Sequence, residues 1–421
     1  MIDGDAVPVF QFAIFYTMDL EINPGAPMKV TGKVHSNGNL YSAPPSSLEF
    51  AQSVDAAGSI YNRRAPYDPT GGSSTVPVYD IPPVPNSSSL TLPISTNNSP
   101  AVVQQITEPP PFGEDPSSPM GTSRYYNQCD LIVTVTASNV TVNAGLWDNF
   151  AAQSPDTVAT NGNTGYSFVQ TNASFYDARE KKWTLTTDLN VKTLTNWMNS
   201  ASGGKSLNQL ASATKGHQLN SIYVQDTRTG AGDLTVVRVS NGQQLPPSGL
   251  TVATDLPLYV EGNFNAPDTT PGSTNTANTK PASLVGDAIT VLSANWSDAY
   301  GNNSLSARTP ANTTVNAAFL AGIVQPTNTT GTLHYSGGVE NFPRFLENWS
   351  GYTFTYNGSM VVMYPSQFAT NYWVQTGTYY NAPNRRWAFD VNFLDYRRLP
   401  PATPQVRKLV RGQWNVVAAA Y

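Results

Sequence analysis

Short apolar segments separated by glycine, proline and small polar residues recur along the whole chain. They are rich in Val, Ile, Thr, Tyr and Phe, which is the pattern of β-strands bounded by turns. The pattern predicts strands near residues 9–16, 131–136, 140–142, 168–175, 183–185, 221–224, 234–239, 256–264, 288–292, 352–356, 360–364 and 387–393. The chain is therefore expected to be mainly β.

An internal repeat is present in the first sixty residues. The segment 34–41 aligns with 54–61 at a fixed shift of 20 positions, and each copy has a glycine followed by an apolar–tyrosine pair. A repeat of this length with one glycine per turn is typical of a coil in a parallel β-solenoid, because glycine permits the corner. We therefore expect a parallel β-helix or solenoid-like domain, and two ordinary hairpins with glycine turns are the alternative.

Helical spacing occurs at three places inside this β pattern. Asp188 is a good N-cap residue for a helix in which Val191, Leu194 and Met198 share one face. A weaker helix is predicted around residues 207–211. A third short helix is predicted near residues 342–349, where four apolar residues would share a face.

The composition changes between the β-rich segments. Residues 66–119 hold 13 of the 33 prolines, and proline cannot donate a hydrogen bond to a β-ladder. We expect a solenoid-like segment at residues 1–65, a Pro/Ser-rich linker or surface wrap at 66–127, an α+β insertion at 128–220, and a returning β-rich domain at 221–421. The first and last of these regions would form one discontinuous β domain.

Charge and cysteine content narrow the class of protein. The chain has 23 Lys and Arg against 28 Asp and Glu, a formal net charge of −5, which excludes a strongly basic nucleic-acid-binding protein. Cys129 is the single cysteine, so no disulfide can form within the chain.

No apolar run reaches the ~18 residues that a membrane helix needs. Since strand-like sequence begins almost at once, we expect an export or anchor element to lie upstream.

A set of sequence strings occurs together and in a characteristic order. The strings are residues 12–16, 18–22 and 34–41, then 258–265 and 280–290, and finally 339–342, 348–351 and 392–395. Together they resemble the bacterial PilX-like, pilus-assembly-related envelope proteins. The resemblance implies a pilin-type membrane helix, lacking here, before a large β-helical ectodomain. It also implies an extracytoplasmic location at the cell surface or in the medium, with pilin-like or envelope proteins as partners, and it supplies no catalytic residues.

Few residues are of the kinds that bind metals or act as nucleophiles. The histidines are His35, His217 and His334. His35 occupies the position where the second repeat has Asp55, so it is expected in a solvent-facing turn, and Cys129 is expected to be a small buried hydrophobe. Transition-metal spacings are absent. Calcium is the one cofactor left open, through oxygen ligands in residues 3–5 or 295–303, and an Asx turn is the alternative.

Three carboxylates are the candidate catalytic residues. Parallel β-helices often carry polysaccharide hydrolases and lyases, and glycosidases use two acids across the scissile bond. Asp287, Asp298 and Glu340 lie in the least repetitive stretches of the chain. Each also has a structural explanation, such as a turn after Gly286 for Asp287 or a favourable helix-dipole charge for Glu340. No spacing ties the three acids together.

Two aromatic pairs are the candidate ligand-binding residues. Tyr372-Trp373 and Tyr379-Tyr380 fall in a polar stretch rich in Asn and Thr, where exposed rings could stack on sugars or on a partner subunit. Cross-strand pairing of these rings within a sheet is the alternative.

The sequence favours a non-enzymatic, structural or adhesive ectodomain of a pilus-associated bacterial surface protein, which acts by protein or glycan interaction. Two alternatives remain open. One is a secreted carbohydrate-active hydrolase or lyase on a β-helix, which would use Asp287, Asp298 or Glu340. The other is a glycan-binding module that uses the aromatic pairs without turnover.

Overall fold

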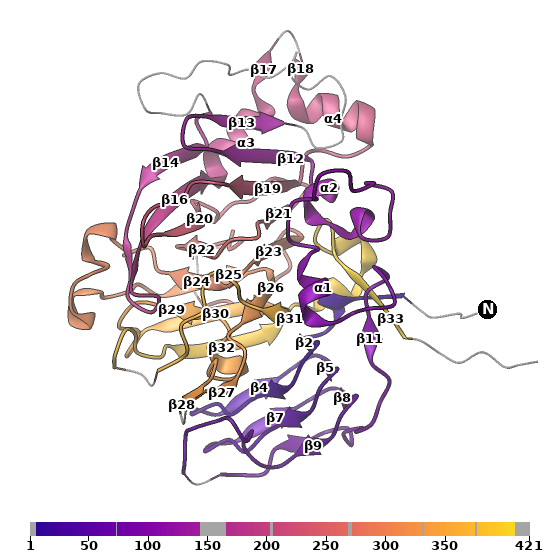
Figure 1. The fold of residues 1–421 in the computed structure, drawn as a ribbon, viewed down its shortest axis with the longest axis vertical. Coiled ribbons are helices and arrows are strands. Elements are labelled where there is room, and N and C mark those ends of the chain that lie inside the picture. The colour runs from indigo at the N-terminus through magenta and orange to yellow at the C-terminus, as the bar shows by residue number, and fades with distance from the viewer. Residues whose placement is uncertain are drawn as a thin grey trace, which may run out of the picture.

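Most of the β-strands are paired in parallel, in sheets that run through the length of the molecule (Figure 1). The computed structural model describes residues 6–72, 74–143, 166–202, 205–267, 272–329, 332–374 and 377–408. Its largest sheet has ten strands, of which all neighbours are parallel except the first two, in the order β13 (Val140–Asn143), β12 (Leu131–Val135), β19 (Ser221–Asp226), β21 (Leu250–Ala253), β23 (Ala282–Gly286), β26 (Ala318–Ile323), β31 (Met360–Pro365), β2 (Ile14–Tyr16), β5 (Val34–Ser36) and β8 (Val54–Ala56). The prediction of a mainly β chain is confirmed.

A second long sheet accompanies the first. Its strands, parallel from β16 onward, are β14 (Val169–Ala173), β16 (Lys182–Asn190), β20 (Leu234–Ser240), β22 (Leu258–Glu261), β24 (Ile289–Leu292) and β29 (Arg344–Phe345), and β15 (Tyr176–Asp177) pairs with β16. These strands alternate along the chain with those of the ten-stranded sheet.

Three small parallel sheets hold most of the remaining strands. They are β25 (Thr313–Asn316), β30 (Thr353–Gly358) and β32 (Asn384–Phe389); β4 (Met28–Val30), β7 (Leu48–Phe50) and β10 (Val78–Tyr79); and β3 (Leu20–Glu21), β6 (Leu40–Tyr41) and β9 (Ile60–Tyr61). A short antiparallel sheet pairs β1 (Ala6–Pro8) and β11 (Leu90–Thr91) with β33 (Gln405–Lys408). Two further hairpins are β17 (Ala201–Ser202) with β18 (Lys205–Ser206), and β27 (Thr327–Thr329) with β28 (Thr332–His334).

The 20-residue repeat sets the register of the N-terminal strands. Val34 pairs with Val54 and Leu40 pairs with Ile60, as the alignment of the two copies requires. A third copy precedes them, because Ile14 pairs with Val34 at the same shift. Since the paired strands run parallel, the alternative of two hairpins is wrong. Each repeat instead supplies strands to three different sheets.

The order of the strands in the ten-stranded sheet differs from their order along the chain. Strands β2, β5 and β8, from the beginning of the chain, lie at one end of this sheet, and β12 lies near the other end (Figure 1). The proline-rich region between them holds the short helices α1 (Pro100–Gln104) and α2 (Tyr125–Gln128), and α1 packs against β31. From β12 the chain winds back until β31 pairs with β2.

Two of the three expected helices are present. They are α3 (Val191–Asn199) and α4 (Leu207–Lys215), which pack against each other near the β12 end. The side chain of Asn190 caps α3, whereas Asp188 belongs to strand β16, so the predicted N-cap is wrong by two positions. Ser206 forms a capping box with Gln209 at the start of α4.

The helix expected near residues 342–349 is wrong. A 3₁₀ turn at Val339–Asn341 is followed by strand β29, which pairs in parallel with β24. The apolar residues that suggested one helical face, Phe342, Phe345, Leu346 and Trp349, are all buried. Burial between packed sheets accommodates apolar side chains on both sides of an extended chain, so their spacing did not define a helix.

His35 is in the core, and the expectation of a solvent-facing turn is wrong. Its side chain is 1% exposed and stacks on the ring of Phe15 at 5.4 Å. Its Nδ1 is hydrogen-bonded to the carboxylate of Asp55, which occupies the next position in register, and its Nε2 contacts Oδ1 of Asn37 at 2.8 Å. The adjacent repeat therefore satisfies one ring nitrogen, and Asn37 of the same repeat satisfies the other.

The glycines of the second and third repeats, Gly38 and Gly58, pack directly on the preceding repeat. A Cβ atom on Gly38 would lie 2.5 Å from the backbone nitrogen of Asp19, whereas a Cβ on Gly25 would meet nothing within 4 Å. We predict that Gly38→Ala lowers the free energy of unfolding by ~1–3 kcal/mol, as overpacking does. Gly25→Ala is the matched control and should change it little. Urea denaturation of both variants checks this, and equal stabilities would show that the repeats are not in close contact there.

Candidate functional site

The N-terminal repeats join the C-terminal strands at a single junction, which we call the seam. In the ten-stranded sheet this junction is an ordinary ladder, in which the N–H of Met360 donates to the carbonyl of Ala13 at 2.8 Å. The other strands of the N-terminal repeats form separate sheets: β4 lies against β32 without pairing to it, and β3 and β29 end different sheets. Cavities can therefore form at the seam beside the continuous sheet.

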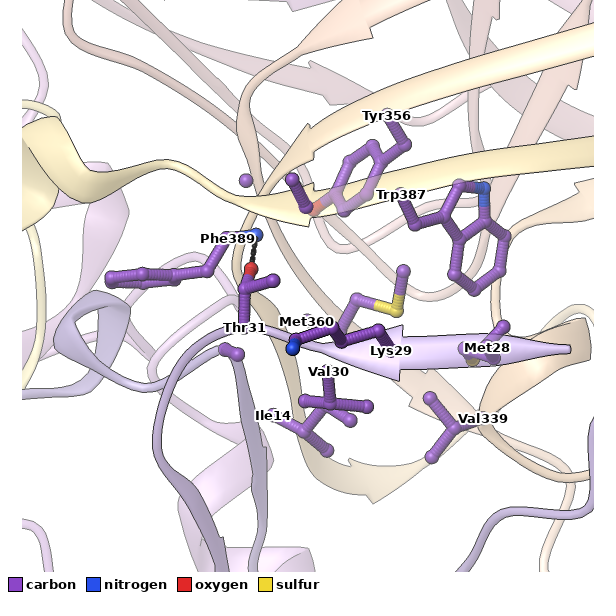
Figure 2. Close-up of a pocket in the computed structure, with 13 residues that line it drawn as sticks. Ile14, Met28, Lys29, Val30, Thr31, Val339, Tyr356, Met360, Trp387 and Phe389 are labelled. Carbon is purple, nitrogen blue, oxygen red and sulfur yellow. Dashed lines mark hydrogen bonds between the residues drawn. The ribbon is translucent and has the colours of Figure 1, made fainter. Parts of the chain in front are cut away.

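One of these cavities is apolar and lies between β4 and β32 (Figure 2). It has a volume of about 40 Å³, and Met28, Val339 and Met360 are among the residues that line it. The N–H of Phe389 donates to Oγ1 of Thr31 across the seam at 2.9 Å, as Figure 2 shows. This cavity offers few polar groups with which to orient a ligand.

The second cavity is polar, and we call it the seam pocket. It has a volume of about 210 Å³, far above the ~15 Å³ that one water molecule needs, so it has room for a small organic ligand. Segments from both sides of the seam line it, with the residues Asn23, Gly25, Arg64, Thr70, Tyr335, Gly337, Glu340, Asn341, Trp373, Tyr380, Ala382 and Arg385. Three of the residues singled out in the sequence, Glu340, Trp373 and Tyr380, meet here.

A chain of hydrogen bonds fixes one wall of the seam pocket. The indole N–H of Trp373 donates to the hydroxyl of Tyr380 at 2.7 Å, and that hydroxyl donates to Oδ1 of Asn341 at 2.9 Å. Arg385 donates to the same oxygen at 3.4 Å. Tyr335 packs edge-to-face on Trp373, with ring centroids 5.9 Å apart. These contacts hold the aromatic and polar groups of this wall in place.

Two buried carboxyl groups lie at the seam, and one of them lines the pocket. Glu340, in the 3₁₀ turn, accepts a hydrogen bond from the backbone N–H of Asn23 at 3.2 Å. Glu21, on β3, accepts from Nδ2 of Asn23 at 2.7 Å and from the N–H of Ala65 at 2.9 Å. Burial raises the pKa of Glu340 to about 7 and the pKa of Glu21 to about 8. Both groups are therefore held protonated over much of the acidic range.

The two arginines of the seam pocket differ in their partners. Arg64 forms an ion pair with Asp68 at 2.7 Å. Among the described residues, Arg385 has no carboxylate within 4.0 Å, and its Nε is buried without a hydrogen-bond partner. Burial lowers the pKa of Arg385. Desolvation of a charge is costly, so a guanidinium that is shielded from water in part usually has an acidic partner.

Asp287 lies away from the seam pocket and holds a loop. Its carboxylate accepts hydrogen bonds from the backbone N–H groups of Gln367, Phe368 and Ala369, the last at 2.8 Å. Its side chain is almost fully buried, and burial raises its pKa. The structure therefore gives this carboxylate three backbone partners and places it apart from Glu340.

Asp298 belongs to a third location, in a cluster of charged residues on the second long sheet. Its carboxylate pairs with Arg238, which also pairs with Asp188 and Glu261. The indole N–H of Trp296 donates to Asp298 at 2.9 Å. The structure therefore does not bring Asp287, Asp298 and Glu340 together.

The two aromatic pairs occupy different environments. Tyr372 is 39% exposed, whereas Tyr379 and Tyr380 are 4% and 3% exposed and stack on each other at 5.3 Å. The expectation of an exposed ring pair at Tyr379-Tyr380 is wrong, because Val374 and Trp373 donate hydrogen bonds to their hydroxyls and turn both rings inward. Trp373 is half-buried and lines the seam pocket.

Residues suited to metal binding or nucleophilic attack are dispersed. No group of three His, Cys, Asp or Glu side chains that could hold a metal occurs among the described residues, and the calcium candidates at residues 3–5 lie outside them. Cys129 is buried, as expected, and burial raises its pKa. His217 is exposed, and the side chain of His334 lies outside the description. No helix in the described part of the chain has the length and apolarity to cross a bilayer.

Comparisons with known proteins give a distant structural likeness. No family model matches the chain, and no curated protein matches it. A solved structure to which it is similar is the competence-associated pilin ComZ from Thermus thermophilus, with 12% identity and a TM-score of 0.37, over 97% of this chain and 74% of that chain. A likeness of this size defines neither a fold nor a function.

Several residues of the seam pocket were not identified from the sequence. Asn23, Arg64, Tyr335 and Arg385 come from segments far apart in the chain, and no local motif connects them. One residue beside the pocket could have been noticed in the sequence. Glu21 occupies the position that is in register with Tyr41 and Tyr61. A carboxylate at a position that the other repeats fill with an aromatic residue marks a departure from the structural pattern.

The buried acids predict a pH dependence of stability. Between about pH 4.5 and 8 the unfolded chain releases the protons of Glu21 and Glu340 while the folded chain retains them, so the free energy of unfolding should fall as pH rises. Each pKa unit corresponds to ~1.4 kcal/mol per group. The double variant Glu21→Gln/Glu340→Gln should reduce this dependence in urea denaturation at pH 5 and pH 8, and the part that remains comes from other buried acids such as Glu347. Glu49→Gln, at an exposed pair, is the control, and an unchanged slope in the double variant would contradict the assignment.

The contacts of Asp287 predict a structural role for its carboxylate. Asp287→Asn replaces one acceptor oxygen by a donor that faces backbone N–H groups, so it should lower the free energy of unfolding by ~1.5–3 kcal/mol. Hydrogen exchange at the amides of residues 367–369 should accelerate in parallel. Asp395→Asn, at an exposed ion pair, should change neither property. Full stability together with the loss of a polysaccharide-degrading activity would instead identify Asp287 as catalytic.

Proposed function

We propose that this chain is the extracytoplasmic ectodomain of a pilus-associated bacterial surface protein that acts by binding, with the seam pocket as its recognition site. The observation that carries the binding role is the composition of this pocket, in which a half-buried indole faces amide, guanidinium and carboxyl groups. Small-molecule sites have this character, with apolar walls and a few fixed polar groups. The surface location rests on the resemblance of the ordered sequence strings to PilX-like envelope proteins.

A parallel β-helix is the scaffold that we propose for this role. Three repeats with a shift of 20 residues, each contributing strands to three sheets, support this interpretation. In this scheme the coils run from β12 to β32 and continue through the N-terminal repeats. Such a stack is stiff, because every coil is hydrogen-bonded to its neighbours.

A hydrolase of polysaccharides is the second candidate, and Glu340 is the observation in its favour. Its raised pKa suits a general acid. Glycosidases, however, use a pair of carboxyl groups that flank the scissile bond. Among the described residues that line the seam pocket, Glu340 is the one carboxyl group, and Glu21 lies behind Asn23 and Tyr335. Binding without turnover is therefore the better supported function.

The proposed function predicts where the protein is found. An antibody raised against this chain should detect it in membranes or in sheared filaments of the source bacterium, on a polypeptide longer than 421 residues. A cytoplasmic enzyme probed in the same fractions is the control. Detection in the culture supernatant alone, at the size of this chain, would contradict the pilus-associated role. Release of reducing ends from polysaccharides by the purified chain, abolished by Glu340→Gln, would favour the hydrolase.

A further inference from the structure

We propose that the seam pocket binds a uronic-acid unit of an acidic saccharide, with the carboxylate on Arg385 and the sugar ring against Trp373. The inference rests on the proposed binding function and adds the chemical class of the ligand. It is drawn from the partners, burial and charge of the residues that line this cavity.

Arg385 is the group that points to a negatively charged ligand. It lines the seam pocket, it is half-buried with its Nε fully shielded from water, and none of the described carboxylates lies within 4.0 Å of it. Within the described part of the chain, its one hydrogen bond to a side chain is the long contact of 3.4 Å with Asn341. A guanidinium in such a place has unused donors in a planar fork, which matches the two oxygens of a carboxylate.

The charges around Arg385 permit a carboxylate to approach it. Arg64, the other arginine of the seam pocket, is already paired with Asp68. Glu340 is the carboxyl group that lines the cavity, and its burial keeps it largely protonated below pH 7. A bound carboxylate would therefore face one unpaired cation and a neutral acid at mildly acidic pH.

The rest of the cavity suits a sugar ring. The indole of Trp373 is held by its hydrogen bond to Tyr380 and by the edge of Tyr335, so it presents a fixed apolar surface. Gly337 lies against this indole, where a Cβ atom would be 2.7 Å from the ring, so a larger residue would displace it. Glu340 adds a carboxyl group that can bond to a sugar hydroxyl, whereas the side-chain amides of Asn23 and Asn341 are already hydrogen-bonded within the protein.

Calorimetric titration of the whole chain at pH 6 tests the inference. The probes are methyl β-D-glucuronide, the neutral methyl β-D-glucoside, and propionate, which has a carboxylate and no ring. The wild-type chain should bind the glucuronide at least 10-fold more tightly than either other probe. Arg385→Gln should weaken glucuronide binding by about 10- to 100-fold and leave glucoside binding unchanged, as expected for the loss of a charge-assisted pair. Trp373→Ala should weaken binding of both sugars.

The matched control is Arg386→Gln, because Arg386 is the next residue on β32, is exposed, and does not line the cavity. It should bind the glucuronide like the wild type, and thermal denaturation should show that all variants are folded. Equal binding of glucuronide and glucoside would overturn the acidic class but keep a sugar site. Binding of propionate as tight as that of the glucuronide, or binding of no probe, would overturn the inference. The fractionation experiment would still decide the surface role independently.

Discussion

Strand β2 is held in place by backbone hydrogen bonds to β31, a strand from the opposite part of the chain. Ile14 pairs with Met360, and the N–H of Thr17 donates to the carbonyl of Val362 at 3.0 Å. Three short repeats with two- and three-residue strands could bury little apolar surface alone. Pairing with β31 lets them share the core of the larger stack, so the N-terminal repeats, the seam and both seam cavities all depend on this one ladder.

The same ladder explains why cavities lie where they do. Backbone pairing crosses the seam in the ten-stranded sheet, whereas β4 and β32 meet through side chains and the Thr31–Phe389 hydrogen bond. Side chains do not fix the spacing of two strands as closely as a ladder does. The gap on one side of the seam is lined by apolar residues, and the gap elsewhere on the seam becomes the polar seam pocket.

The sequence allowed the local part of this architecture to be predicted, because a repeat in parallel register requires the same spacing in every copy. The alignment of Val34 with Val54 therefore gave the pairing of their strands directly. It could not give the environment of His35, which depends on the stacking of Phe15 and on Asp55 from the next repeat. Helix prediction succeeded at α4, where Ser206 supplies a local cap, and failed near Phe345, where burial on both sides imitated a helical face. The seam pocket could not be predicted, since Asn23 and Arg385 become neighbours only through the distant pairing of β2 with β31.

The two cavities of the seam differ in the side chains that line them, and only the apolar lining is what packing alone would favour. Beside β4 the gap is lined by Met28, Val339 and Met360. Burial of such apolar side chains stabilises the folded state. At the seam pocket the chain instead places the buried Glu340 and a half-buried Arg385 that has no carboxylate partner among the described residues, and Glu21 replaces the aromatic residue of the neighbouring repeats. Each of these groups must be desolvated on folding, and a buried ion without its counter-ion destabilises the protein by several kcal/mol. The buried Asp287 is satisfied by three backbone N–H groups, whereas Arg385 has no carboxylate partner among the described residues, and this difference is the physical argument behind the proposal that the seam pocket binds a ligand.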